Sequence, residues 1–268
     1  MKALAETAAA LLGGTLRNAQ PVHGGCLSQI VRITLSDSRE AIVKGGGAPR
    51  IEGAMLRAIA ASGAPAPQVF EEADDILVME VMPANGNLDN AWDSLGKVLA
   101  TLHAAPGSAC GWADDYAFST VVIENGWQKS WPSFWAERRL LPNCPQVASA
   151  LARRIEALAA DLANRLPELP EPSLLHGDLW GGNILAEGNR VTALIDPACY
   201  YGHGEVDIAM LNLFDRPSPA FYDAYGALEP GWNERLIIYQ LWPALVHVRL
   251  FGSGYRPMVE RLLSQAGA

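Results

Sequence analysis

The segment LLHGDLWGGNILAEGNRVTALIDPA constrains this chain more than any other, because it fixes the spacing of several polar residues around a predicted hairpin. Asp178 follows a short apolar run, Asn183 comes five residues later, and Asp196 ends the segment's second strand-like run. The runs NIL and VTALID have the composition of strands, and the turn AEGNR between them is centred on Gly188 and Asn189. Folding these strands together brings Asn183 and Asp196 to the same end of the ribbon, beside Asp178.

These three residues are the types that phosphoryl transfer in the kinase style requires. One aspartate orients the acceptor hydroxyl and takes its proton, while an asparagine and a second aspartate hold Mg²⁺. The offset from Asp178 to Asn183 matches the kinase pattern H-R-D-L-x-x-x-N, with Gly177 in place of the arginine. We therefore predict Asp178 as the catalytic base and Asn183 and Asp196 as metal ligands. Taken singly, each residue would be better explained as part of a turn or as a cap, and only their combination favours the kinase interpretation.

A kinase site also needs a lysine and a glutamate upstream that together position the nucleotide. Lys44 ends the strand-like run EAIVK, and Glu52 lies at the start of the next helical pattern, RIEGAMLRAIAASG. Alone, a lysine at a strand end is usually solvated, and a glutamate in a first helical turn usually favours the helix dipole. In this order, before Asp178, they favour an ATP-binding pair, although the connector GGGAPRI between them is short.

Two further segments are candidates for nucleotide contacts. Gly24 and Gly25, in the turn HGGCLS, could cover phosphates with backbone N–H groups, although an ordinary hairpin has the same pattern. Cys26 in that turn is either a reactive thiol or an inert small residue. Backbone groups of Glu80 and Met82, in the run ILVMEVM, are predicted to bind adenine, and a buried strand would look identical.

The order of patterns predicts an α+β, two-lobed, protein-kinase-like fold. Residues 1–82 carry strand-like runs and one long helical pattern, which indicates a small lobe with an antiparallel sheet and a helix. Residues 83–268 are mainly helical and contain the catalytic segment. We expect the last long helical pattern, NERLIIYQLWPALVHVRLF, to be bent or interrupted at Pro243.

Composition excludes several other classes of protein. The net charge is -9 and no lysine or arginine cluster is present, which disfavours nucleic-acid binding. No apolar run reaches the length of a membrane span, and the N-terminus lacks the features of a signal peptide, so we expect a cytoplasmic protein that does not act at a membrane. The four cysteines have neither metal-ligand nor disulfide-framework spacing.

Longer motifs place the chain in a narrower group. GGCLS, HGDLWGGN, IDPACYYGHGEVDIAM, GWQKSWPSFWAERRLLP and RLIIYQLWPALVHVRLFGSGY occur in this order. With them, the chain resembles the fructosamine kinases, or ketosamine-3-kinases, over essentially its full length. This family is a branch of the aminoglycoside phosphotransferase and choline kinase-like superfamily. HGDxxxxN with a later aspartate is shared by the whole superfamily, whereas the tryptophan after HGDL and the pattern W-x-x-F-x-x-x-R-L are narrower.

The resemblance implies a kinase that uses ATP and Mg²⁺ to phosphorylate the sugar 3-hydroxyl of a fructosamine- or ribulosamine-type ketoamine, as in deglycation repair. Trp180 and His203 are then candidate substrate contacts. Alternatively, Trp180 packs the loop, and His203 braces the helical lobe together with Glu205 and Asp207. We also expect His176 to orient the loop by hydrogen bonding.

An aromatic-rich cleft would suit such an acceptor, because aromatic faces bind sugars by stacking and cationic amines by cation–π contact. We expect the segment that carries Trp131, Phe134, Trp135 and Arg139 to supply that surface.

Two alternatives stay open. One is a kinase of the same fold for an aminoglycoside, choline or a similar metabolite, and the other is a catalytically silent pseudokinase that serves as a binding module. The joint presence of Lys44, Asp178, Asn183 and Asp196 speaks against the second. The acceptor can be a free glycated amine or a glycated protein lysine, and the oligomeric state is unknown from these motifs.

Overall fold

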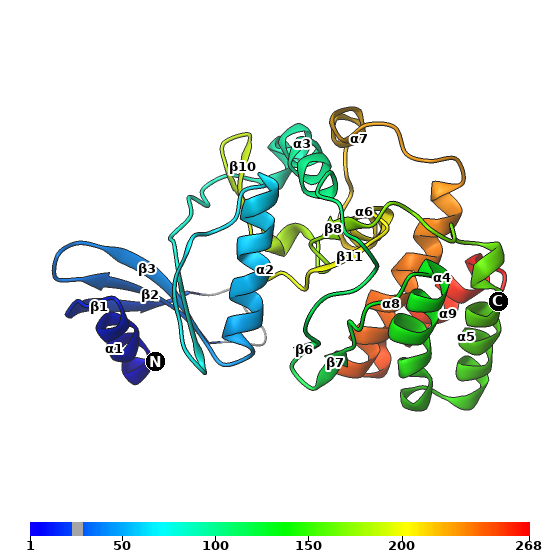
Figure 1. Cartoon of the computed structure of the whole chain (residues 1–268), viewed down its shortest axis with the longest axis horizontal. Helices are drawn as coiled ribbons and strands as arrows, with labels where there is room; N and C mark the ends of the chain where they lie inside the picture. Colours follow the sequence, from blue (N-terminus) through cyan, green and yellow to red (C-terminus); the bar gives the residue numbers. More distant parts are fainter. Residues whose placement is uncertain (23–28) are drawn as a thin grey trace.

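The first part of the chain forms a five-stranded antiparallel sheet in the computed structural model, which describes residues 1–22 and 29–268. The strand order is β1-β2-β3-β5-β4, so β3 lies at the centre of the sheet, as Figure 1 shows at the left of the molecule. Alternate residues of β2 and β3 are buried, as expected for a sheet with one face on the core. The strands are β1 (Leu16–Pro21), β2 (Gln29–Leu35), β3 (Glu40–Gly45), β4 (Val69–Glu72) and β5 (Ile76–Met79).

Two helices pack with this sheet. Helix α1 (Lys2–Leu11) buries Ala5, Ala8 and Ala9 in a cluster with apolar residues of β2, β3 and β5. Helix α2 (Pro49–Ser62) begins with a proline in its first turn and ends at Gly63, whose φ of 92° gives a left-handed cap. Helix α2 occupies the segment in which the sequence predicts a helical pattern.

A tight connection between β3 and α2 brings the two predicted nucleotide-site residues together. Gly46 and Gly47 have φ values of 82° and 74°, which only glycine adopts without strain. The chain can therefore reverse within a few residues and start α2 beside the end of β3. The short connector between Lys44 and Glu52 is thus compatible with direct contact between them.

The rest of the chain is mainly helical, with one large core (Figure 1). Helices α3 and α7 pack closely against each other, and α6 packs on α8, the longest helix of the described residues. The helices are α3 (Trp92–His103), α4 (Trp131–Phe134), α5 (Ser149–Asp161), α6 (Glu205–Phe214), α7 (Pro219–Tyr225), α8 (Trp232–Phe251) and α9 (Arg256–Gln265). The 3-10 turns are η1 (Leu88–Asn90), η3 (Leu141–Gln146), η4 (Leu162–Asn164), η5 (Gly181–Asn183) and η6 (Ser253–Tyr255), and η2 (Trp135–Leu140) is a π-helix.

Three small antiparallel ribbons accompany these helices. They are β6 (Tyr116–Phe118) with β7 (Val121–Ile123), β8 (Ser173–Leu175) with β11 (Tyr200–Gly202), and β9 (Ile184–Glu187) with β10 (Arg190–Leu194). The β9–β10 ribbon is the hairpin predicted from the sequence, and Gly188 in its turn has a φ of 58°. The division predicted after residue 82 falls between β5 and η1.

The last long helical pattern, which the sequence predicts to be bent or interrupted at Pro243, forms one continuous helix. Helix α8 runs from Trp232 to Phe251 without interruption at Pro243. The ring of a proline removes one backbone hydrogen bond, but the surrounding turns of α8 are buried against α6 and the large core, and this packing maintains the helix. Among the described residues, no helix combines the length and the apolar composition needed to cross a membrane.

Candidate active site

The lysine and glutamate predicted from the first lobe form a buried ion pair. Lys44 Nζ lies 2.7 Å and 2.8 Å from the two carboxylate oxygens of Glu52, and 2.9 Å from Asp196 Oδ1. Burial alone would lower the pKa of Lys44, but the charges of Glu52 and Asp196 more than offset it, so the net shift is upward. Lys44 therefore stays cationic and holds Glu52 of α2 and Asp196 of the second lobe at one point.

The hairpin places Asn183 and Asp196 together, as predicted. Ile184 pairs with Leu194 in the ribbon, and the Ile195 N–H donates to the Asn183 carbonyl at 3.0 Å. Asp196 has a φ of 52°, a left-handed conformation that costs a non-glycine residue roughly 1–3 kcal/mol. This strained backbone lies where the chain turns its carboxylate toward Lys44.

Asp178 and Asn183 are joined directly. The Asn183 Nδ2 amide donates to the Asp178 backbone carbonyl at 2.8 Å and to Asp178 Oδ2 at 3.0 Å. Burial raises the pKa of Asp178 to about 7, and the negative charges of Asp196 and Asp207 add to this, while the Asn183 hydrogen bond opposes it. Because the amide nitrogen is used on Asp178, the Oδ1 atom of Asn183 is the one suited to a cation.

Asp207 holds the backbone of the loop from behind. Its carboxylate accepts the N–H of His176 at 2.7 Å and that of Gly177 at 2.9 Å, and His103 Nε2 lies 3.2 Å away. Gly177 has a φ of 80°, and a Cβ there would lie 2.0 Å from the Ala198 carbonyl oxygen. Glycine is therefore required at the position where protein kinases carry arginine.

His176 orients the same loop. Its Nε2 lies 3.0 Å from the Ile195 carbonyl, which requires a proton on Nε2, and its Nδ1 then accepts the Asp178 N–H at 3.3 Å. Burial lowers the pKa of His176, so the ring stays neutral in this tautomer. The expected orienting role of His176 agrees with these contacts, which tie the loop to the strand end before Asp196.

A cleft of about 880 Å³ opens in front of these groups. On one side lie Lys44, Glu52, Asp178, Asn183 and Asp196. The other side is a surface that we call the apolar wall, built by α6, α8 and η6. The apolar wall consists of Met210, Phe214, Trp242, Pro243, Val246, His247, Leu250, Phe251 and Tyr255.

Trp180 lies at this cleft, two residues after Asp178. It is 42% exposed, although most large apolar side chains of the chain are buried. A Cβ added to Gly182 would lie 2.3 Å and 2.4 Å from atoms of the Trp180 ring, so the ring lies directly over Gly182. The glycine after the tryptophan therefore leaves room for this side-chain position.

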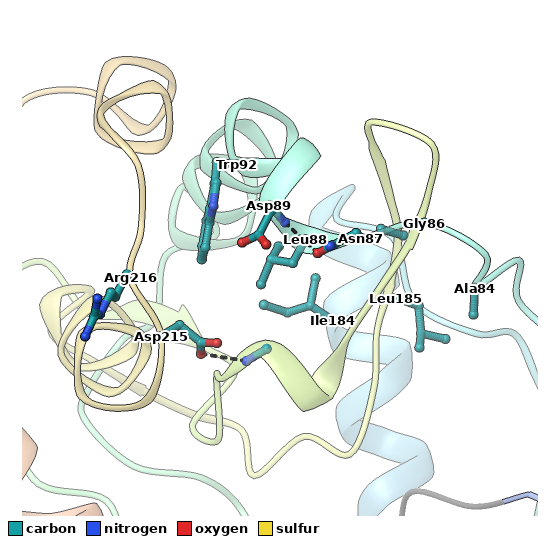
Figure 2. Close-up of a pocket in the computed structure, with 12 residues that line it drawn as sticks. Ala84, Gly86, Asn87, Leu88, Asp89, Trp92, Ile184, Leu185, Asp215 and Arg216 are labelled. Atoms are coloured by element: carbon teal, nitrogen blue, oxygen red, sulfur yellow. Dashed lines mark hydrogen bonds between the residues drawn. The ribbon is translucent and has the colours of Figure 1, made fainter.

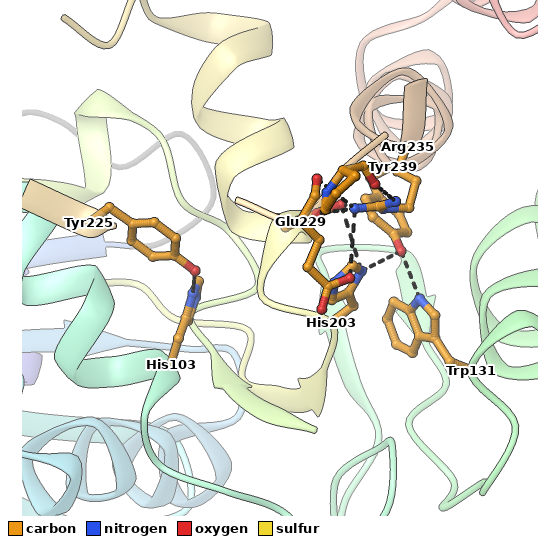
Figure 3. A network of polar contacts seen from close by, with 9 residues as sticks. His103, Trp131, His203, Tyr225, Glu229, Arg235 and Tyr239 are labelled. Atoms are coloured by element: carbon orange, nitrogen blue, oxygen red, sulfur yellow. Dashed lines mark hydrogen bonds and ion pairs between the residues drawn. The ribbon is translucent and has the colours of Figure 1, made fainter. Parts of the chain in front are cut away.

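His203 lies elsewhere, in a polar network shown in Figure 3. Its Nδ1 is 2.8 Å from Tyr239 Oη, which also accepts the Trp131 Nε1 proton at 2.9 Å. Arg235 donates to both oxygens of Glu205 at 2.6 Å and 2.7 Å beside it. His203 is buried and is not among the residues that line the cleft. This location agrees with bracing by His203 and Glu205 and gives no support to a substrate contact.

The expected aromatic acceptor surface is also located differently. Trp131, Phe134, Trp135 and Arg139 are all fully buried, and so cannot line an open cleft. The Arg139 guanidinium lies 4.7 Å, 4.2 Å and 4.9 Å from the ring centres of Phe134, Tyr200 and Trp242. The segment thus supports the apolar wall from beneath, and the wall itself comes from α6, α8 and η6.

A second cavity, of about 570 Å³, lies on the other side of the loop. Figure 2 shows Asp89 and Asp215 in it, with a hydrogen bond to Asp215 from the loop backbone. The donor is the Gly181 N–H, at 2.8 Å from Asp215 Oδ2. Burial and the nearby Asp89 charge raise the pKa of Asp215, while the Gly181 hydrogen bond lowers it. Asp215 is a loop contact that the sequence motifs did not indicate.

Several predicted nucleotide contacts stay untested. Gly24, Gly25 and Cys26 lie outside the described residues. The Glu80 N–H is bonded to the Gln68 carbonyl at 2.9 Å, so its own carbonyl is the backbone group left for a ligand. Neither Glu80 nor Met82 belongs to the residues that line the two cavities described above. Their adenine-binding role stays a prediction.

The fold and this arrangement define a kinase-like protein with two lobes. An aminoglycoside phosphotransferase in complex with ADP and hygromycin B has the same fold, with a TM-score of 0.70, 15% identity and 99% of each chain covered. A crystal structure assigned as a fructosamine-3-kinase from Thermobifida fusca is more similar, with a TM-score of 0.91, 29% identity and 99% of each chain covered.

Sequence comparison places the chain more narrowly. The sequence model of the fructosamine kinase family matches residues 2–267, and the chain belongs to this family. A protein assigned as a ketoamine kinase in Synechocystis is 40% identical over 203 residues. That alignment covers 70% of this chain and 66% of the relative, just under two thirds of its length.

Proposed function

We propose that this protein is an ATP-dependent kinase that phosphorylates the sugar 3-hydroxyl of fructosamine- or ribulosamine-type ketoamines. The observation that carries the proposal is the convergence of Lys44, Glu52 and Asp196 beside the hydrogen-bonded pair of Asp178 and Asn183. Membership of the fructosamine kinase family supports the same reaction. The name of the Thermobifida fusca relative supports the 3-hydroxyl as the position that is phosphorylated.

The residues present fit Mg²⁺. Asn183 directs its amide nitrogen to Asp178, which leaves a neutral oxygen for a cation, and Asp196 provides a carboxylate beside it. Hard oxygen ligands of this kind suit Mg²⁺, which keeps several waters and is completed by nucleotide phosphates. Bound there, the ion would neutralise charge on the β- and γ-phosphates. We propose Asn183 and Asp196 as its protein ligands.

The protein's own groups would then perform the transfer as follows. Lys44, kept charged by Glu52, would bind nucleotide phosphates. Asp178 would accept the proton of the acceptor hydroxyl while the hydroxyl oxygen forms a bond to the γ-phosphorus and the bond to ADP breaks. Asp207 and His176 would keep the Asp178 backbone in place. We further propose that residues 1–82 and 83–268 act as nucleotide and acceptor lobes.

The cleft also suits a ketoamine acceptor. Half-exposed Trp180 stands beside Asp178, and Phe214 and Phe251 of the apolar wall contribute further aromatic faces. A ketoamine combines a sugar with a cationic amine, and aromatic faces can contact both, at roughly 0.5–2 kcal/mol for a cation–π contact. Because the cleft is open at Trp180, we propose that it accepts amines attached to larger groups, including glycated protein lysines.

One assay tests the proposal. Purified protein is supplied with Mg²⁺ and ATP and, in separate reactions, fructosyl-lysine, ribulosyl-lysine, a glycated protein, kanamycin or choline. We expect ADP formation with the ketoamines, and NMR of the product should locate the phosphate on the sugar 3-hydroxyl. Turnover of kanamycin or choline without turnover of any ketoamine would overturn the acceptor assignment and leave a kinase of another specificity. No ADP formation with any acceptor, together with Mg²⁺–AMP-PNP binding, would favour a silent pseudokinase.

A further inference from the structure

The β6–β7 hairpin reaches into the cleft from the second lobe. Five consecutive residues, 116–120, line the cleft together with Lys44, Glu52 and Trp242. On β7, Val121 and Ile123 are buried in the large core, whereas Val122 between them is 59% exposed on the opposite face. The hairpin is therefore anchored by one strand and presents its other strand and its turn to the cleft.

One end of this cleft-facing strand contacts the nucleotide-site ion pair. The Tyr116 hydroxyl donates to Glu52 Oε2 at 3.5 Å, and Glu52 is the residue that holds Lys44. Burial raises the pKa of Tyr116 strongly, and the negative charges of Glu52, Asp196 and Asp178 raise it further. Tyr116 therefore stays a donor, and it links the second lobe to α2 of the first.

The other end of the same strand contacts the apolar wall. Phe118 lies edge-on to Tyr116, with ring centres 6.1 Å apart, and its ring centre is 6.4 Å from that of Trp242. Residues two apart on a strand point to the same side, so Tyr116 and Phe118 move as one surface when the hairpin moves. A continuous set of contacts thus runs from Lys44 and Glu52 through the hairpin to Trp242.

We propose that the β6–β7 hairpin couples the nucleotide side of the cleft to the apolar wall, with Tyr116 as the positioning residue for Glu52. Displacing Phe118 at the wall moves Tyr116 away from Glu52, which loosens the orientation of Lys44. By reciprocity, a nucleotide that favours the ordered Lys44–Glu52 pair favours the hairpin position that shapes the wall. The inference rests on the proposed function in that the cleft must bind a nucleotide, but it does not depend on which acceptor is used.

The test compares nucleotide affinities and needs no acceptor. The dissociation constant of Mg²⁺–AMP-PNP is measured by calorimetry for the wild type, Tyr116→Phe, Phe118→Leu and the double variant. Tyr116→Phe removes only the hydroxyl, so we expect binding to weaken by about threefold, because the 3.5 Å hydrogen bond to Glu52 is long. Phe118 has no polar group to offer Lys44 or Glu52, yet Phe118→Leu should weaken binding by a similar factor. The double variant should bind Mg²⁺–AMP-PNP as tightly as whichever single variant binds it less tightly.

Val122→Ala is the matched control, because Val122 belongs to the same hairpin but faces away from the cleft. It should leave nucleotide affinity unchanged, and thermal melting of all variants shows that each is folded. Unchanged affinity in Phe118→Leu, or single effects that multiply in the double variant, would overturn the coupling. A wild-type protein that binds no Mg²⁺–AMP-PNP would instead overturn the proposed function and this inference with it.

Discussion

The loop around Asp178 and the apolar wall line the same cleft, but they are built in different ways. The loop takes its geometry from about twenty consecutive residues, whose polar groups bond to one another and to Asp207. The apolar wall is assembled from α6, α8 and η6, and its shape depends on a buried layer that includes Trp135 and Arg139, both of which contact Trp242. Polar catalytic geometry can thus be local, whereas an apolar binding surface depends on tertiary packing.

The largest expected effect belongs to the loop. Asp178→Asn keeps the size of the side chain but removes the group that accepts the hydroxyl proton, so kcat should fall by about 10²- to 10⁴-fold. Mg²⁺–AMP-PNP affinity should stay within about threefold of wild type, because Lys44, Glu52 and Asp196 are unchanged. Single-turnover kinetics and calorimetry measure the two quantities.

Asp74→Asn provides the control for this substitution, since the Asp74 side chain is 95% exposed and is not among the residues that line the cleft. It should leave both kcat and nucleotide affinity at wild-type values. If Asp178→Asn kept more than about a tenth of wild-type kcat, the activation free energy would have risen by less than about 1.36 kcal/mol. The loop would then not provide the base.

A smaller effect should follow from releasing the loop without altering Asp178. Asp207→Asn replaces one of two accepting oxygens with an N–H₂ group, which cannot accept the N–H of His176 or Gly177. We expect kcat to fall by about 10- to 100-fold through misplacement of Asp178. The free energy of unfolding should fall by about 1–3 kcal/mol because a buried donor loses its partner. Urea unfolding gives the second value, and a stable variant with wild-type kcat would contradict the bracing role.

The loop and the apolar wall also differ in how much of their structure can be predicted from the sequence. The hairpin argument located Asn183 and Asp196 correctly, because the strand runs and the turn at Gly188 fix the register without reference to the rest of the fold. The Lys44–Glu52 pair was likewise identified from strand and helix order. Asp215 was missed, since its bond to Gly181 spans 34 residues and no motif marks it.

The apolar wall could not be identified from sequence for a physical reason. Trp131, Phe134 and Trp135 are buried, while the more exposed Phe214 and Phe251 line the cleft, yet all are aromatic residues of helical segments. Periodicity shows which residues share a face but not whether that face meets the core or a cleft. The same limit applies to Tyr116, whose contact with Glu52 joins residues 64 positions apart.

The distinction between the wall and its support predicts opposite outcomes for two matched substitutions. Phe251→Leu removes an aromatic face that is 51% exposed and lines the cleft, so the acceptor KM should rise by about three- to tenfold, from a loss of roughly 1 kcal/mol of aromatic contact. The KM for ATP should change less. Trp131→Phe removes the hydrogen bond to Tyr239 (2.9 Å) and leaves a void in the core, so it should lower the free energy of unfolding by about 1–3 kcal/mol while leaving both KM values unchanged. If the acceptor KM rose only in Trp131→Phe, the segment around Trp131, and not the apolar wall, would be the surface that binds the acceptor.

The smallest expected effect lies where the loop meets the acceptor, at Gly182. Its backbone is not in the left-handed region, so alanine is compatible with the chain, but the new Cβ would lie 2.3 Å from the Trp180 ring in its present position. The ring must therefore move. If Trp180 contacts the acceptor from this position, Gly182→Ala should raise the acceptor KM by about threefold, a loss of roughly 0.7 kcal/mol, with the KM for ATP unchanged. Trp180→Ala removes the obstacle, so adding Gly182→Ala to it should have no further effect, and steady-state kinetics on the four proteins of this cycle measure the interaction. Effects that multiply would show that Gly182 acts on the loop independently of Trp180.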